Sequence, residues 1–234
     1  MPASKPSALL LPPDLYDVTA GDKRRTAQEK LLGMLPPQSP QLSQPVPPVD
    51  PKLIPAPVIQ SVIQKLLIAS GSQRQNSQER KTHRMLVGLA APQLGEPYRI
   101  ILIDERVTSA RTHGGRLTCL INPKVVWRSR ETEEGREGCF SAGPVWGLVR
   151  RPVAVKVRAL TPSGDKIERV FEGFTARIVQ HEIDHLDGIR FPDRIRSDRK
   201  RHWVHAEEIP VYPENIQHWP RLCSKDRWKR YISG

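Results

Sequence analysis

Two short stretches of this chain have the residue types and spacing of a metal site. The first reads Glu-Gly-Cys-Phe-Ser and contains Cys139, and forty-two residues later a second stretch, 181–185, reads His-Glu-Ile-Asp-His. Residues four apart in a helix lie on one face, so His181 and His185 can bind one ion with Glu182 beside it. A divalent ion with three protein ligands keeps a position for water and lowers its pKa towards about 7. The pattern predicts metal-assisted hydrolysis.

The third ligand is less obvious from the spacing. After the second histidine the chain reads Leu-Asp-Gly, and no further histidine follows at the spacing of the common zinc peptidases. Cys139 is the best candidate because a thiolate is a strong soft ligand, and Gly138 before it lets the backbone approach a substrate. A buried structural cysteine is the alternative reading of Cys139.

Three segments in this order resemble the three motifs of peptide deformylases. Residues 88–95 read GLAAPQLG, residues 137–141 read EGCFS, and residues 180–188 read QHEIDHLDG. The likeness covers roughly residues 38–197. That family removes the N-terminal formyl group from the initiator methionine of nascent chains, and the resemblance implies this function here.

The resemblance also implies a role for each site residue. The metal, ferrous iron in the family with zinc, nickel or cobalt as substitutes, would be held by Cys139, His181 and His185. Glu182 would act first as general base and then as general acid. The developing oxyanion would be stabilised by the side-chain amide of Gln93 and the backbone N–H of Phe140. Substrate binding would involve Val87, Gly88 and Gly138.

The chain departs from the family at three positions near these motifs. Leu86 stands where the first motif usually begins with glycine, and it would strain the turn if that position has positive φ. Trp146 aligns with an arginine that in some bacterial relatives helps to hold the peptide backbone. Phe140 replaces a leucine, but only its backbone amide has a role. We expect a reshaped groove and altered peptide affinity, with the chemistry intact.

The composition sets limits on partners and compartment. The chain has 234 residues, three cysteines and a formal net charge of +12. With Cys139 assigned to the metal, Cys119 and Cys223 are expected to be free thiols, and no run of eighteen apolar residues predicts a membrane span. The positive charge favours polyanions such as the ribosome near its exit tunnel, but no motif of a sequence-specific nucleic-acid binder is present.

The chain is predicted to have three parts. Residues 1–37 form a Pro-rich, disordered extension, with a short helix near 25–34 as an option; residues 38–197 form the catalytic domain; and residues 198–234 form a basic, Trp-containing extension. Residues 71–84 look like a flexible insertion. Within the domain we expect a helix from Pro57 to Gly71 and a metal-binding helix capped by Thr175 and ended by Gly188.

Five strands are expected to precede the metal-binding helix, which makes the fold α+β, with antiparallel strands packed around a central HExxH helix. Their ranges are 99–105, 117–121, 125–127, 153–160 and 166–171.

Two rival functions and the location stay open at this point. A metalloamidase or peptidase acting on another acyl substrate would use the same ligands, and a noncatalytic, ribosome-associated protein could keep the fold. The location is a mitochondrion or plastid for a eukaryotic source and the cytoplasm for a bacterial one, because formylated initiation belongs to bacteria and to organelles of bacterial descent.

Overall fold

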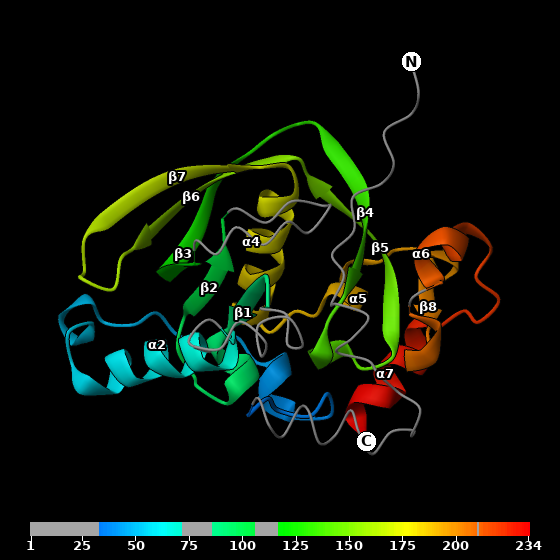
Figure 1. The fold of residues 1–234 in the computed structure, drawn as a ribbon, viewed down its shortest axis with the longest axis horizontal. Coiled ribbons are helices and arrows are strands. Elements are labelled where there is room, and N and C mark those ends of the chain that lie inside the picture. The colour runs from blue at the N-terminus through cyan, green and yellow to red at the C-terminus, as the bar shows by residue number, and fades with distance from the viewer. Residues whose placement is uncertain (1–32, 72–85, 106–116, 210) are drawn as a thin grey trace, which may run out of the picture.

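Antiparallel strands in two sheets make up most of the protein (Figure 1). The computed structural model describes residues 33–71, 86–105, 117–209 and 211–234. A five-stranded sheet has the order β1-β2-β3-β6-β7, and a three-stranded sheet has the order β4-β5-β8. The strand bounds are β1 Gly88–Ala90, β2 Ile100–Asp104, β3 Leu117–Arg128, β4 Thr132–Gly138, β5 Val145–Pro152, β6 Ala154–Leu160, β7 Lys166–Glu172 and β8 Arg201–Trp203.

Helix α4, Gly173–Leu186, lies in the middle of the molecule and carries both histidines (Figure 1). Its apolar side packs on the five-stranded sheet in one core cluster that includes Ala176, Val179 and Leu186. The helix begins two residues before Thr175, and no side chain caps its N-terminus, so the predicted Thr175 cap is wrong. Gly188 follows the helix with φ of 69°, the left-handed conformation that glycine adopts at little cost after a helix end. The predicted α+β class is confirmed.

The predicted strands correspond to β2, β3, β6 and β7 of the structure. The two strands predicted over residues 117–121 and 125–127 are one strand, β3, whose pairing with β6 shifts register after Ile121 and after Val125. Strands β1, β4, β5 and β8 were not predicted. The sequence of β4, Thr-Glu-Glu-Gly-Arg-Glu-Gly, has no alternation and many charges, yet its last four residues are buried. Two of those charges, Glu134 and Glu137, are paired by side chains from other elements, which a local pattern does not reveal.

The segment before the first sheet packs closely against the motifs. We call residues 33–46 the N-terminal arm. The Leu35 N–H donates to the carbonyl of Gln93 at 2.8 Å, and the Val46 N–H donates to the carbonyl of Leu186 at 2.9 Å. Helix α2, Pro57–Ala69, follows and buries Ile59, Val62, Ile63 and Leu66, as its periodicity predicted. The predicted helix near residues 25–34 and the insertion at 71–84 lie almost entirely outside the described residues.

The C-terminal segment also docks on the domain. It contains α5 Phe191–Arg194, α6 Tyr212–Asn215 and α7 Lys225–Ser233. Trp219 and Trp228 are buried, and the Trp228 indole N–H donates to Asp193 at 2.9 Å. These tryptophans therefore serve intramolecular packing. None of the helices in the described ranges has the length and apolar character that crossing a membrane requires.

Candidate metal centre and active site

The three predicted metal ligands meet in one buried cluster. One ligand atom from each of Cys139, His181 and His185 lies within 4.8 Å of the others. The Cys139 Sγ is 3.4 Å from the His185 Nε2, and the two imidazole rings cross nearly at right angles with centroids 5.0 Å apart. Cys139 lies between the end of β4 and the 3-10 turn η5, Phe140–Ala142, while both histidines come from α4. One cysteine and two histidines that converge in this way form a donor set that suits a divalent metal ion.

Glu137 orients one of the two histidines. Its Oε2 is 2.9 Å from the Nδ1 of His181. A carboxylate there accepts the Nδ1 proton and leaves Nε2 as the ligand atom, which is the usual arrangement of a metal-bound histidine. The residues present therefore fit a metal ion, including the group that supports the ligand from behind.

Behind the ligands lies a layer of ion pairs, which we call the ionic layer: Glu137, Arg151, Arg177 and Asp184. Arg151 binds Glu137 with two bonds of 2.6 and 2.8 Å and reaches Asp184 at 2.9 Å. Arg177 contacts Glu137 at 3.0 Å. All four side chains are buried. Burial opposes ionisation of Glu137, but the charge and hydrogen bonds of Arg151 hold its pKa well below the usual range.

The two histidines have opposite proton preferences. Burial disfavours a charged His181, but the bonds and charges of Cys139 and Glu137 outweigh it and hold the His181 pKa well above its usual value. For His185, burial and the nearby positive charge of His181 hold the pKa well below its usual value. The His185 Nδ1 has no hydrogen-bond partner among the described residues. The surroundings thus favour the charged form of His181 and the neutral form of His185.

Glu182 lies beside the cluster and has a pKa that suits proton transfer. Burial raises its pKa to about 7, near the pH at which a general base and acid works best. Its Oε2 is buried without a hydrogen-bond partner among the described residues. Gly88 makes room for it: a Cβ at that position would come within 2.4 Å of the Glu182 Oε1. Only glycine lets strand β1 pass this close.

Gln93 is held with its amide directed at the cysteine loop. Its Oε1 accepts the backbone N–H of Ala90 at 2.8 Å, which fixes which end of the amide faces the site. Its Nε2 lies 3.1 Å from the Ser141 Oγ and 3.5 Å from the Cys139 Sγ. The side chain comes from η4, Ala91–Leu94, a single 3-10 turn directly after β1. An N–H donor is therefore positioned beside the cluster of predicted metal ligands.

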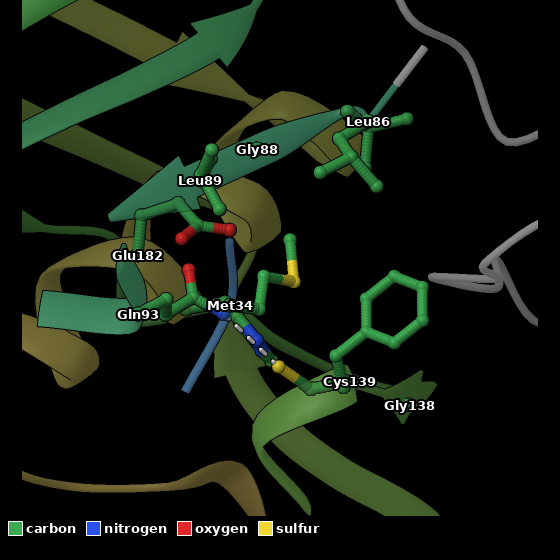
Figure 2. Close-up of a pocket in the computed structure, with 11 residues that line it drawn as sticks. Met34, Leu86, Gly88, Leu89, Gln93, Gly138, Cys139 and Glu182 are labelled. Carbon is green, nitrogen blue, oxygen red and sulfur yellow. Dashed lines mark hydrogen bonds between the residues drawn. The ribbon is translucent and has the colours of Figure 1, made fainter. Parts of the chain in front are cut away.

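A pocket opens at these residues (Figure 2). Its walls include the predicted catalytic residues Gln93, Phe140 and Glu182 and the predicted substrate-binding residues, and its full lining is Met34, Leu86, Val87, Gly88, Leu89, Gln93, Gly138, Cys139, Phe140, His181 and Glu182. Every predicted site residue except His185 lines this pocket. His185 lies behind the pocket wall in α4, where its Nε2 contacts the Cys139 Sγ.

The expectation that Trp146 lies at the groove is wrong, and the condition for strain at Leu86 is not met. Trp146 does not line the pocket; it is buried, and its ring packs on Gly138, where a Cβ would come within 2.5 Å of the indole, and on Tyr212 of α6 at a centroid distance of 5.8 Å. Leu86 is not strained, because among the described residues only Asn122 combines positive φ with a side chain. Leu86 is instead buried as part of the pocket wall.

Sequence reasoning missed several residues that shape this site. Met34 lies in the segment predicted to be disordered, yet it lines the pocket. In the sequence, Glu137 is only the first residue of a motif, and Arg151 and Arg177 are only charges in apolar surroundings. A buried soft-ligand cluster, a carboxylate with a pKa near neutrality and an aligned amide donor define the class of protein: a metal-dependent hydrolase.

Comparison with known proteins identifies the family. The sequence profile described as polypeptide deformylase matches residues 34–201. The chain is 43% identical over 115 residues to the peptide deformylase of Desulforudis audaxviator, covering 49% of this chain and 70% of that protein. It is 40% identical to peptide deformylase 2 of a Nostoc species, covering 48% of this chain and 64% of that protein. The chain belongs to the polypeptide deformylase family, whose members are metal-dependent hydrolases.

Solved structures of the family share the fold. The Met-Ala-Ser-bound class I type b peptide deformylase of Acinetobacter baumannii matches with a TM-score of 0.59 and 32% identity over 69% of this chain and 96% of that one. The actinonin-bound form of the same enzyme has a TM-score of 0.56, over 70% of this chain and 97% of that one. The predicted family, enzyme class and peptide deformylase function are confirmed at this level.

Proposed function

We propose that this chain hydrolyses the formyl group from the N-terminal formylmethionine of newly synthesised proteins. The observation that carries the proposal is the buried cluster of Cys139, His181 and His185 with Glu182 and Gln93 at its edge. The Met-Ala-Ser complex of the Acinetobacter baumannii relative supports a peptide substrate that begins with methionine.

Cys139, His181 and His185 would hold a divalent ion, which when bound supplies a Lewis acid and lowers the pKa of water. Ferrous iron is the ion we propose for the cell, with zinc, nickel or cobalt as substitutes, because one thiolate and two imidazoles suit these ions. Glu137 keeps His181 in the ligand tautomer through the 2.9 Å contact to its Nδ1.

Glu182 would carry the proton of the reaction. As a carboxylate it accepts a proton from the attacking water, and as a carboxylic acid it then donates that proton to the departing amine. A pKa of about 7 makes both forms accessible near neutral pH. Its burial keeps bulk water from competing for the proton.

Two N–H donors would stabilise the charge that develops on the formyl oxygen. The Gln93 amide lies beside Cys139, and the Phe140 backbone N–H directly follows the cysteine in η5, Phe140–Ala142. Donors that are held in place before the reaction cost no reorganisation when the charge forms. Gln93 is held in this way by the Ala90 N–H.

The cellular setting is part of the proposal. Nascent chains leaving the ribosome carry the formylated end, and the net charge of +12 favours approach to ribosomal RNA. We propose a mitochondrial or plastid location for a eukaryotic source and a cytoplasmic one for a bacterial source.

The test is formate release from formyl-Met-Ala-Ser by the full chain, purified without oxygen and loaded with ferrous iron. We expect turnover by the wild type, and Glu182→Gln should retain the metal but lose about 10²–10⁴-fold in kcat, the usual contribution of proton transfer. Metal content measured on both proteins is the control. Equal turnover by the two would refute the role of Glu182. Metal binding without formate release would favour another acyl substrate.

A further inference from the structure

One wall of the active-site pocket comes from the N-terminal arm. Met34 lies more than fifty residues before the first motif in the sequence, yet it shares the pocket with Gly88, Cys139 and Glu182. Figure 2 shows its side chain extending into the space bounded by Leu86, Leu89 and Glu182 on one side and Cys139 on the other. Met34 is 8% exposed and belongs to the same apolar cluster as Leu86, Leu89 and Phe140.

The backbone around Met34 is held in place by contacts of its neighbours along the arm. The Leu35 N–H donates to the Gln93 carbonyl at 2.8 Å, so the residue next to Met34 is tied to a site residue. Further along the arm, the buried guanidinium of Arg190 donates to the carbonyl of Pro37 at 2.5 Å and to the Ser43 Oγ at 2.6 Å. The arm is therefore seated on the catalytic motifs by directional bonds.

The space left beside Met34 is too small for a substrate side chain. The cavity has a volume of about 30 Å³, which is room for one or two water molecules. A methionine side chain has four heavy atoms and does not fit. A substrate methionine needs apolar surroundings, and Met34 already occupies such surroundings in the cluster with Leu86, Leu89 and Phe140.

We propose that Met34 is an internal competitor: its side chain occupies the place of the substrate's methionine and leaves when a formylmethionyl peptide binds. This inference rests on the proposed function. Met34 is the wall residue suited to move, because it lies outside every helix and strand and has an unbranched side chain with three rotatable bonds. Leu89 is held in β1 and Phe140 in η5. A site that is open only part of the time binds more weakly in proportion.

The kinetic test compares Met34→Ala with the wild type, using formyl-Met-Ala-Ser. Removing the competitor should lower KM by about fivefold, the factor expected if the site is open about one fifth of the time, with kcat unchanged. Met34→Leu keeps an apolar occupant and should lower KM by less than Met34→Ala. Leu53→Ala, at a position 49% exposed and away from the pocket, is the matched truncation and should leave KM unchanged. An unchanged or higher KM in Met34→Ala would overturn the proposal.

A second test follows the side chain directly and needs no turnover. The chain has three methionines, so ¹³C-methyl labelling gives three signals, and Met34→Leu identifies one of them. In zinc-loaded wild type, adding the product peptide Met-Ala-Ser should move the Met34 methyl signal to the position of a solvent-exposed methionine. A Met34 signal that stays in place at saturation would overturn the proposal.

The two tests also separate this inference from the proposed function. If the peptide displaces Met34 but no formate is released by the iron-loaded enzyme, the competitor role stands and the proposed reaction fails. If formate is released while the Met34 methyl stays in place, the reaction stands and the competitor role fails.

Discussion

The two sides of the active site differ in the kind of side chain, because one side is charged and the other is apolar. On one side, Glu137 of the ionic layer contacts His181 from behind, and the layer is held together by short, directional contacts such as the two bonds between Arg151 and Glu137. On the other side, the apolar side chains pack within one cluster, and we call the following four residues the apolar mouth: Met34, Leu86, Leu89 and Phe140. The first arrangement has one geometry of low energy, and the second can repack.

This difference suits the two tasks of a hydrolase. A misplacement of about 1 Å among reacting groups can cost about 10²-fold in rate, so the proton carrier and the ligands need rigid support. Recognition of a methionine side chain tolerates repacking, because apolar contacts have no preferred direction. Phe140 belongs to both sides: its backbone N–H lies next to Cys139, and its ring lies in the mouth.

Among the substitutions that compare the two sides, the largest effect should come from the backbone of Phe140. Phe140→Pro removes the N–H proposed to stabilise the oxyanion and should lower kcat by about 10²–10³-fold. The local geometry accepts proline: Cys139 has φ of −153° and ψ of 144°, the extended region that precedes proline, and Phe140 is the first residue of η5. The measurement is kcat for formate release, together with metal content. Full activity in a folded, metal-loaded Phe140→Pro would rule out this donor.

The ionic layer should show the next largest effect. Glu137→Gln weakens the support of His181 and leaves Arg151 and Arg177 short of a buried counter-charge. Metal affinity should fall about 10–100-fold, and the free energy of unfolding should fall by about 3 kcal/mol. Chelator competition measures the first and denaturant titration the second.

Glu134→Gln is the matched control, because it makes the same substitution on β4, where Glu134 pairs with the half-exposed Lys200. Such a pair contributes about 0–1 kcal/mol. Equal losses of metal affinity in the two variants would contradict a special role for Glu137.

Some parts of the fold and of the site could be predicted from the sequence, and others could not. Cys139, His181, His185, Glu182 and Gln93 were predicted because each sits in a contiguous motif, and helical spacing alone puts the two histidines on one face. The core helix α2 was predicted from the spacing of its apolar residues. These are local patterns, and local patterns can be recognised in the sequence alone.

The parts that were missed depend on contacts between distant segments. Strand β4 reads as a polar loop, because the arginines that neutralise Glu137 come from β5 and α4. Trp146 was placed in the groove by alignment, but Tyr212 and Gly138 enclose it. Met34 reaches the pocket only because the arm is bonded to Gln93 and Arg190. No periodicity or motif encodes such contacts.

The smallest effect should come from the ring of Phe140, and it separates the two sides of the site at one residue. Phe140→Leu keeps the backbone N–H and an apolar side chain, so kcat should change by less than about twofold, since hydrophobic replacements of similar volume are well tolerated. Its effect should appear in KM, because the ring packs in the cluster that contains Met34 and Leu86. Steady-state kinetics on formyl-Met-Ala-Ser resolve the two parameters. A kcat as low as that of Phe140→Pro would mean that the ring supports the chemistry, and that the apolar mouth is as rigid a part of the catalytic machinery as the ionic layer.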